Sequence, residues 1–190
     1  MIKTELRKTY LEKIRSLSVG ERARKSQQIA DLLFQILTLD RPMVLHCFIA
    51  IEKFNEVDTT LIFRRLWGEF PQVTTVVPRV DIQTGEMRHL KFTPDTELVK
   101  NVWDIYEPGH NEYVEINEID IVLVPMLCFD RQLHRVGFGK GFYDRFLSSL
   151  RADSQTIGLS YFPPVEKIDD IHEDDVALDI CVTPTNILSR

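Results

Sequence analysis

The sequence predicts a three-layer α/β/α domain with a mostly parallel central sheet, and two features of the chain point to it. Five short, nearly continuous apolar runs are typical of strands buried on both faces of a helix-covered sheet. Segments with helical periodicity lie between these runs. No repeat, low-complexity tract or linker divides the 190 residues. We therefore expect a single Rossmann-like domain over residues 1–190, with the N-terminal helices packed on the sheet.

Two amphipathic helices are predicted ahead of the first strand. Apolar residues recur at three- and four-residue steps over 2–17. Ser18 and Glu21 then have the spacing of a capping box, which satisfies free N–H groups at the start of a helix. The second helix ends at 40–42, where Pro42 follows Asp40-Arg41.

The rest of the chain alternates between predicted strands and predicted helices. Strands are expected at 43–51, 73–80, 119–128, 155–161 and 178–183, and helices at 58–70, 140–151 and 164–170. A turn over 81–86 leads into a possible hairpin partner at 87–92. The rest of 81–118 has no clear pattern.

The composition is that of a soluble globular protein, with 44% hydrophobic and 27% charged residues. The formal charge of −6 argues against a general binder of nucleic acid or anionic membranes. The 3 cysteines lie in apolar runs and are expected to be buried free thiols. The sequence has no signal peptide and no apolar run near the roughly 20 residues that span a bilayer, so a cytoplasmic location is expected.

A glycine-rich loop between a predicted strand and a predicted helix is the strongest chemical signal. Gly137, Gly139 and Gly141 alternate with other residues and can present backbone N–H groups to an anion. Arg135 and Lys140 add positive charge. The spacing is neither that of a P-loop nor that of a dinucleotide-binding turn. It favours a phosphate-binding loop of another kind, and a plain glycine-rich turn is the alternative.

Several charged residues elsewhere have both a structural and a functional interpretation. Asp144, in the first turn of the predicted helix, suits either the helix dipole or Mg²⁺ bound with phosphate. Asp179, at a strand end, suits either a cap or a metal ligand. Lys3 and Arg7 share one helix face, where a polyphosphate would relieve their repulsion. Glu56 lies where ligands of open α/β sheets bind, or is an ordinary surface glutamate.

These residues belong to a set of motifs that occur in a recognisable order. The set comprises Lys3-x-x-x-Arg7, residues 55–59 (Asn-Glu-Val-Asp-Thr), Val77-Pro78-Arg79, Glu107-Pro108, Val124-Pro125, Phe129-Asp130, residues 135–145 and Asp179 with Val182-Thr183-Pro184. Over nearly the whole chain this arrangement resembles the 5-formyltetrahydrofolate cyclo-ligase family, or 5,10-methenyltetrahydrofolate synthetases. The block Arg-Val-Gly-Phe-Gly-Lys-Gly-Phe-Tyr-Asp-Arg is its most specific part.

The resemblance implies an ATP- and Mg²⁺-dependent ligase that cyclises 5-formyltetrahydrofolate to 5,10-methenyltetrahydrofolate and releases ADP and phosphate. The formyl oxygen would attack the γ-phosphate, and N10 would then close the ring. Phosphoryl transfer needs mainly positioning and charge neutralisation, which suits the residues found. The implied partners are small molecules, namely ATP and a folate that can carry a polyglutamate tail. Nucleic acid and membranes are not expected partners, and a monomer is expected.

The resemblance also implies roles for individual residues. ATP would contact Lys3, Arg7, Arg135, Val136, Gly137, Phe138, Gly139, Lys140, Gly141, Phe142 and Tyr143. The folate would contact Ile51, Phe54, Glu56, Trp103, Phe138, Gly139, Lys140, Gly141 and Phe142, with Glu56 at the pterin end. Asp144 and Asp179 would hold Mg²⁺. Lys140 and Arg135 would act in catalysis, with Lys140 stabilising charge in the transition state.

The sequence departs from the family pattern at His134, where glycine is usual, and at Val136, where leucine is usual. The stretch from the first strand to Glu56 is also longer, which affects Ile51 and Phe54. We expect a reshaped turn and not a lost site. The alternatives are a non-catalytic folate- or nucleotide-binding protein, and a sugar-phosphate isomerase or CoA-transferase-like enzyme on a related scaffold.

Overall fold

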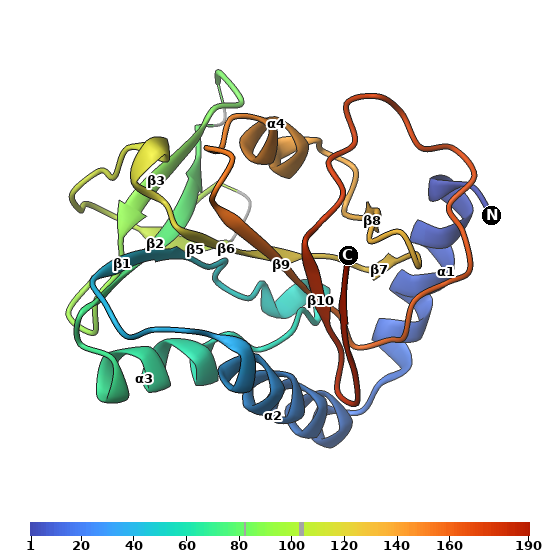
Figure 1. Cartoon of the computed structure of the whole chain (residues 1–190), viewed down its shortest axis with the longest axis horizontal. Helices are drawn as coiled ribbons and strands as arrows, with labels where there is room; N and C mark the ends of the chain where they lie inside the picture. The colour runs from blue at the N-terminus through green and yellow to red at the C-terminus, as the bar shows by residue number, and fades with distance from the viewer. Residues whose placement is uncertain (82, 103–104) are drawn as a thin grey trace.

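The fold is built on a seven-stranded sheet in the order β11-β10-β9-β6-β1-β2-β3 (Figure 1). The computed structural model describes residues 1–81, 83–102 and 105–190. The sheet strands are β1 (Met43–His46), β2 (Val73–Val80), β3 (Met87–Lys91), β6 (Ile121–Pro125), β9 (Gln155–Leu159), β10 (Ile180–Val182) and β11 (Ile187–Ser189). Neighbours from β10 to β2 are parallel, and the edge strands β3 and β11 are antiparallel. The expected mostly parallel sheet is confirmed.

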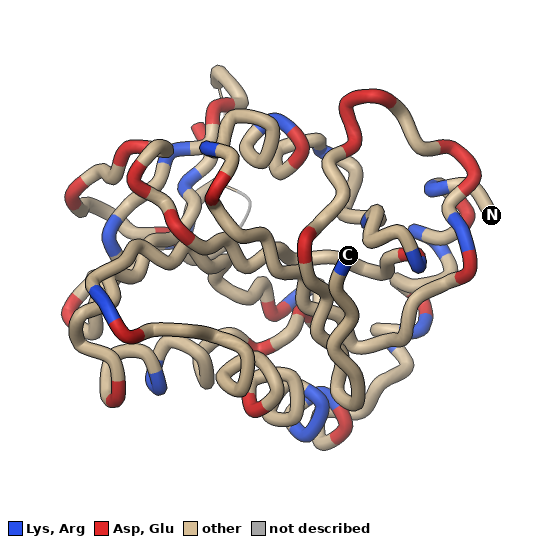
Figure 2. The backbone as a smooth tube through the Cα atoms, in the orientation of Figure 1, with Lys and Arg blue, Asp and Glu red and all other residues tan. Residues whose placement is uncertain are grey.

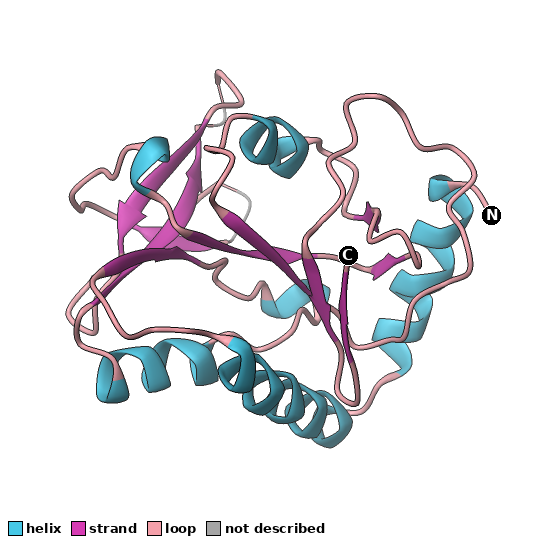
Figure 3. Cartoon of the chain, viewed as in Figure 1, coloured by secondary structure: helices cyan, strands magenta, loops and turns pink. Residues whose placement is uncertain are grey.

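Helices cover both faces of this sheet (Figure 3). They are α1 (Lys3–Ser16), α2 (Val19–Ile36), α3 (Thr60–Glu69) and α4 (Phe142–Ser148). α2 and α3 lie on one face, and α4 lies on the other (Figure 1). α1 packs at one end against the short hairpin of β7 (Cys128–Phe129) and β8 (Arg135–Val136). This arrangement is the predicted three-layer architecture. Of the two N-terminal helices, α2 packs on the sheet, as predicted, whereas α1 packs against the β7–β8 hairpin at its end.

The sheet separates two hydrophobic cores, which explains the continuous apolar runs in the sequence. On the α2–α3 side, Leu45 and Leu123 pack with residues such as Leu33. On the α4 side, the second core contains Val122 and Val124, whose side chains point to the opposite face of the sheet from that of Leu123. Because side chains alternate across a strand, a strand buried on both faces needs apolar residues at every position.

The predicted capping box at the start of α2 is confirmed. The backbone N–H of Glu21 donates to Ser18 Oγ at 3.2 Å, and the Ser18 backbone N–H donates to Glu21 Oε2 at 2.8 Å. Two donors that the helix itself leaves free are thereby satisfied.

Several boundaries differ from the prediction, mostly because apolar runs continue past the strand ends. The run 43–51 forms a strand only over Met43–His46 and then passes into the 3₁₀ turn η1 (Glu52–Phe54). The run 119–128 is divided between β6 and β7. The turn at 81–86 and the hairpin partner at 87–92 are confirmed as the β2–β3 hairpin.

The prediction of a helix at 164–170 is wrong, since the segment is irregular, with bends and one isolated bridge at Val165. Its backbone N–H groups bond elsewhere: Val165 donates to the carbonyl of Phe129 at 2.8 Å, and Ile168 donates to Asp130 Oδ2 at 3.1 Å. The prediction also missed short elements, namely β4 (Leu98–Lys100), β5 (Tyr106–Pro108), η2 (Ile116–Glu118), the β7–β8 hairpin and β11.

The cysteines Cys47, Cys128 and Cys181 are buried and free, as expected. Burial raises the pKa of the Cys128 and Cys181 thiols to about 12. None of the helices in the described part of the chain is long and apolar enough to cross a bilayer.

Two histidines are buried together under α4. The rings of His46 and His89 are 5.1 Å apart, and Phe146 packs on both. Within the described ranges, neither ring nitrogen of His46 has a hydrogen-bond partner. Burial lowers the pKa of His89 to about 4 and holds the pKa of His46 well below its usual value.

We expect this pair to make the fold sensitive to acid. Because the native state keeps both rings neutral, the unfolded chain binds more protons below pH ~6.5, and stability falls from there toward pH ~4. Denaturant unfolding of the native chain and of the double variant His46→Leu/His89→Leu at about pH 7 and about pH 5 measures the effect. The variant should lose less stability on acidification, and an unchanged acid response would show that other groups cause it.

Candidate functional site

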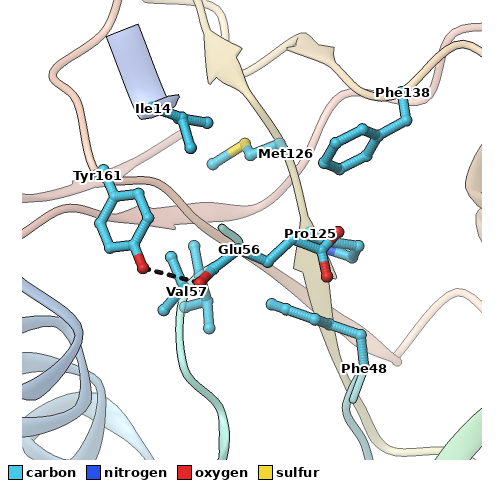
Figure 4. A pocket seen from close by; sticks show the side chains of 9 residues that line it. Ile14, Phe48, Glu56, Val57, Pro125, Met126, Phe138 and Tyr161 are labelled. Atoms are coloured by element: carbon cyan, nitrogen blue, oxygen red, sulfur yellow. Dashed lines mark hydrogen bonds between the residues drawn. The ribbon is translucent and has the colours of Figure 1, made fainter. Parts of the chain in front are cut away.

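The candidate site lies at the carboxyl edge of the sheet, at the neighbouring strands β1 and β6, whose following connections cross opposite faces of the sheet. From β1 the chain crosses through α3 to β2, and from β6 it crosses through α4 to β9, on the opposite face. Between two such strands the connections diverge and leave a crevice, the usual ligand site of open α/β sheets. A cavity here is lined by Phe48, which follows β1, and by Pro125 and Met126 at the end of β6 (Figure 4).

Glu56 extends its side chain into this cavity (Figure 4). Its Oε2 accepts a hydrogen bond from the Ile51 backbone N–H at 2.8 Å. Its backbone carbonyl accepts one from the Tyr161 hydroxyl at 2.7 Å. Burial raises the pKa of Glu56 to about 7, and the bond from Ile51 opposes this shift. A buried carboxyl group with one donor is a strong acceptor for ligand N–H groups.

Two aromatic rings connect the Glu56 cavity to the glycine-rich loop. Phe54 from η1 and Phe138 from the loop have ring centroids 5.2 Å apart. Phe138 also lines the cavity. The cavity measures about 10 Å³, roughly the space of one water centre. The structure therefore brings together Ile51, Phe54, Glu56 and Phe138, four of the residues that the resemblance implies for the folate.

The glycine-rich loop needs glycine at two of its positions. Gly139 has φ +86°, and Gly141, the N-cap of α4, has φ +68°, a region that side chains with a Cβ rarely adopt. A Cβ on Gly139 would also lie 3.1 Å from Arg7 Cζ. Arg7 Nε in turn donates to the Gly137 carbonyl at 3.0 Å. The arginine of α1 thus lies directly against the loop.

Arg135 is buried at the base of the loop and holds three segments together. Its Nη2 lies 2.5 Å from Asp144 Oδ1 in α4, and its Nη1 donates to the Val176 carbonyl at 2.7 Å. Burial lowers the pKa of Arg135, while the carboxylates of Asp144 and Asp175 and the Tyr143 hydroxyl act in the opposite direction. The predicted catalytic arginine is therefore also a structural anchor.

An acidic segment lies beside the first turn of α1 (Figure 2). In this segment, residues 166–175, Asp175 forms a half-buried ion pair with Lys3 Nζ. Asp170 Oδ1 accepts the Lys3 backbone N–H at 2.6 Å. Because Arg7 of the same helix lies against the glycine-rich loop, α1 brings one cation to the acidic segment and one to the loop. The sequence did not single out Asp175, which ends an ordinary acidic run (Glu173-Asp174-Asp175).

Asp179 is not part of this region, contrary to its predicted pairing with Asp144. Its Oδ2 accepts hydrogen bonds from the backbone N–H and the hydroxyl of Thr156, at 2.8 and 2.7 Å. Both residues stand at the amino ends of parallel strands, β9 and β10. The cavity and the ends of β6 and β9 lie at the opposite edge. The carboxylate of Asp179 joins two strands, which corrects the predicted metal pair.

The remaining predicted residues are distributed around the loop. Lys140 is exposed and forms no ion pair with a residue that the structure describes. The hydroxyl of Tyr143 is buried, and among the described residues it has no hydrogen-bond partner. Phe142 lies near the tip of the β2–β3 hairpin, since a Cβ placed on Gly85 would be 4.0 Å from its Cε1. Trp103 falls outside the described residues.

The departures from the family pattern leave the turn before the loop intact. Asp130 Oδ1 accepts the backbone N–H groups of Gln132 and His134, each at 3.0 Å. Val136 is buried and pairs with Cys128 in the β7–β8 hairpin. The turn is therefore held by Asp130, whichever residue stands at 134.

Comparisons with known proteins show which family the chain resembles. A model of the 5-formyltetrahydrofolate cyclo-ligase family matches residues 1–184. A 5-formyltetrahydrofolate cyclo-ligase of Mycoplasma pneumoniae is 30% identical over 164 residues, which cover 85% of this chain and 86% of that protein. One from Escherichia coli (strain K12) is 28% identical over 178 residues, covering 91% and 95%.

A solved structure of similar shape is the 5,10-methenyltetrahydrofolate synthetase of Aquifex aeolicus. It superposes with a TM-score of 0.83 at 28% identity and covers 100% of this chain and 93% of its own. The synthetase of Mycoplasma pneumoniae gives a TM-score of 0.74 at 29% identity, with 97% and 99% covered.

The buried carboxyl group of Glu56 should make stability depend on pH in the neutral range. Because its folded-state pKa of about 7 is raised, its protonated form favours the fold, and stability falls as pH rises from about 4.5 through about 7. Glu56→Gln should remove this loss. From acid to mildly alkaline pH, the unfolding free energy of the variant should therefore rise by up to ~3 kcal/mol relative to that of the native chain. Urea unfolding at about pH 5 and about pH 8 measures the difference, and equal effects at both pH values would contradict the shift.

Proposed function

Because the chain belongs to the 5-formyltetrahydrofolate cyclo-ligase family, we propose that it consumes MgATP to close the 5,10-methenyl bridge of 5-formyltetrahydrofolate. The observation that carries the proposal is that the glycine-rich loop and the Glu56 cavity adjoin each other. The Phe54–Phe138 contact places the glycine-rich loop, with Arg7 and Arg135 beside it, at the cavity that holds Glu56. All of these elements attach to one sheet, so we take residues 1–190 as one catalytic domain.

The chemistry requires that a poor leaving group become a good one. The formyl oxygen attacks the γ-phosphorus of ATP, and the bond from that phosphorus to the ADP oxygen breaks. N10 then adds to the activated formyl carbon and loses its proton. The C–O bond breaks with its electrons on oxygen, so phosphate departs and the methenyl bridge remains. The enzyme needs no nucleophile of its own, only alignment and charge stabilisation.

The nucleotide side of the site is formed by α1 and the glycine-rich loop. The proposed ATP contacts are Lys3, Arg7 and residues 135–143. Amide groups of the loop can bind phosphate oxygens because Gly139 and Gly141 carry no side chain that would cover the backbone. Lys140, exposed on the loop, is free to approach the charge that develops on the transferred phosphoryl group.

The folate side is formed by the Glu56 cavity. The carboxyl group of Glu56 can accept N–H groups at the pterin end, while Ile51, Phe54 and Phe138 supply apolar contacts; Trp103 is the further proposed contact. Ligand pockets commonly measure ~300 Å³ or more, far above the cavity seen here. Phe54 and Phe138 must therefore separate when the pterin enters.

The residues present suit a magnesium ion held largely by phosphate. The described residues contain no group of three His, Cys, Asp or Glu side chains that could hold a metal. Mg²⁺ usually takes only one or two carboxylates, together with phosphates and water. We assign Asp144 and Asp175 as these carboxylates, since Asp144 pairs with Arg135 at the base of the loop and Asp175 pairs with Lys3 of α1. When bound, the ion would neutralise charge on the phosphates. The phosphates of ATP would then replace Asp175 as the ion-pair partner of Lys3.

The reaction is tested by incubating the protein with 5-formyltetrahydrofolate and MgATP and recording the ultraviolet absorbance of the methenyl product. Lys140→Ala and Asp144→Ala should each lower kcat/KM by at least ~100-fold, since each removes charge stabilisation from phosphoryl transfer. Lys8→Ala, which removes an exposed lysine from α1, is the matched control and should stay active. Absence of product with the native chain would refute the activity, and near-native turnover in both site variants would refute the assignment.

Asp175 and Asp179 should differ in what their substitution changes. Asp175→Asn should raise the KM for MgATP and the Mg²⁺ requirement by ~10–100-fold. Asp179→Asn should instead lower the unfolding temperature, because it weakens the bonds from Thr156, and should leave the Mg²⁺ requirement near native. Initial rates over a range of Mg²⁺ and melting curves measure both effects. A changed Mg²⁺ requirement in Asp179→Asn alone would instead support Asp144 and Asp179 as the magnesium ligands.

A further inference from the structure

The proposed site gives no role to Arg145, the last residue of the motif over 135–145. Arg145 lies in the middle of α4, four residues after Gly141, and it is exposed. Because side chains on a helix point toward its amino end, the guanidinium group lies back over the preceding loop. A Cβ placed on Gly141 would be 3.3 Å from Arg145 Nη1. The charge of Arg145 is therefore held against the last glycine of the loop.

The same arrangement is found at Gly139, two residues earlier in the loop. A Cβ placed there would lie 3.1 Å from Arg7 Cζ and 3.3 Å from Arg7 Nη2. Gly139 and Gly141 also share a positive φ, of +86° and +68°. Two guanidinium groups thus lie against alternate residues of one loop, each close to the place that a side chain on the glycine would take. Arg7 is a proposed ATP contact, and Arg145 has the same relation to the loop backbone.

The charge of Arg145 is only weakly engaged within the ranges that the structure describes. Its Nη2 donates to the Gly85 carbonyl at 3.5 Å, which is longer than the usual ~2.7–3.2 Å of such bonds. Its Cζ lies 5.4 Å from the centre of the Phe142 ring. In those ranges Arg145 forms no ion pair with a carboxylate, whereas Arg135 is paired with Asp144. Arg145 is therefore a cation at the loop that an incoming anion can pair with.

We infer that the guanidinium group of Arg145 contacts the phosphates of the bound nucleotide beside the loop amides, an inference that rests on the proposed function. Guanidinium groups offer phosphate oxygens two parallel N–H donors. The long, exposed bond to Gly85 is a small loss when phosphate takes its place. Asp144, the residue before Arg145, is a proposed magnesium ligand, so both side chains would act on the same phosphate chain. Arg145 and Arg7 would then bind the phosphates from α4 and from α1.

A purely structural role for Arg145 would be to fasten the tip of the β2–β3 hairpin to α4 through Gly85. The two roles differ in what lysine can restore at this position. Lysine keeps the positive charge but not the planar fork, so it should recover part of a phosphate contact. Loss of a structural contact would instead lower the melting temperature and would weaken the binding of the folate together with that of the nucleotide.

The test measures by calorimetry the Kd of MgATP and of magnesium tripolyphosphate, without folate. Arg145→Gln should weaken the binding of both by ~10–100-fold while melting at the native temperature, and Arg145→Lys should recover part of the affinity. The difference between the native chain and Arg145→Gln should shrink as ionic strength rises. Arg64→Gln removes the same charge from an exposed position on α3, on the other face of the sheet, and should keep the native Kd (Figure 1).

Native affinity for MgATP in Arg145→Gln would overturn the contact. Equal losses in Arg145→Gln and Arg145→Lys, or a lower melting temperature with a matching loss of affinity for 5-formyltetrahydrofolate, would show a structural role and overturn it as well. So would a loss in Arg64→Gln as large as that in Arg145→Gln, which would show a general effect of charge.

Failure of the proposed function has a different signature. A native chain that binds MgATP through Arg145 but does not convert 5-formyltetrahydrofolate would refute the reaction and support the contact. A native chain that binds neither MgATP nor tripolyphosphate would refute both.

Discussion

The buried guanidinium of Arg135 is the constraint on which the rest of the site depends. A buried cation is tolerated only when it is paired and hydrogen-bonded, and here the partners are Asp144 and the Val176 carbonyl. These contacts join the end of β8, the first turn of α4 and the segment that leads into β10. The loop between β8 and α4 is thereby fixed at both ends. Its backbone can then keep the left-handed φ values of Gly139 and Gly141, which residues with a Cβ rarely adopt.

The sequence predicted those parts of the fold that depend on burial alone. β6 is apolar at every position because helices cover both of its faces, so its existence follows from composition. Its end does not, since Met126 and Leu127 are equally apolar and pack in the cores after the strand has ended. The failed helix at 164–170 has a similar cause. Val165 and Ile168 give their backbone N–H groups to the β7–β8 hairpin, a tertiary contact that no local pattern reports.

The candidate site divides in the same way. Residues close in sequence, such as those of the glycine-rich loop, could be identified from spacing and residue type. Asp175 and Asp179 are only four residues apart, yet one meets Lys3 and the other Thr156 at the amino edge of the sheet. The position of Asp179 follows from the register of β10, which is set by its pairing with β9. The pairing of β2 with β3, which places Arg79 opposite Arg88, is likewise set by register and not by local sequence.

In the proposed mode of nucleotide binding, the ion pair between Lys3 and Asp175 would have a consequence for which form of the nucleotide is accepted. A nucleotide that displaced Asp175 from Lys3 would leave an uncompensated carboxylate in a half-buried place, next to its own phosphates. Bare ATP⁴⁻ would meet that carboxylate as a like charge, whereas a nucleotide that carries a divalent cation would bring the missing countercharge with it. The pair would thus discriminate between the free and the metal-loaded nucleotide through electrostatic repulsion in the ground state, before any bond is made or broken.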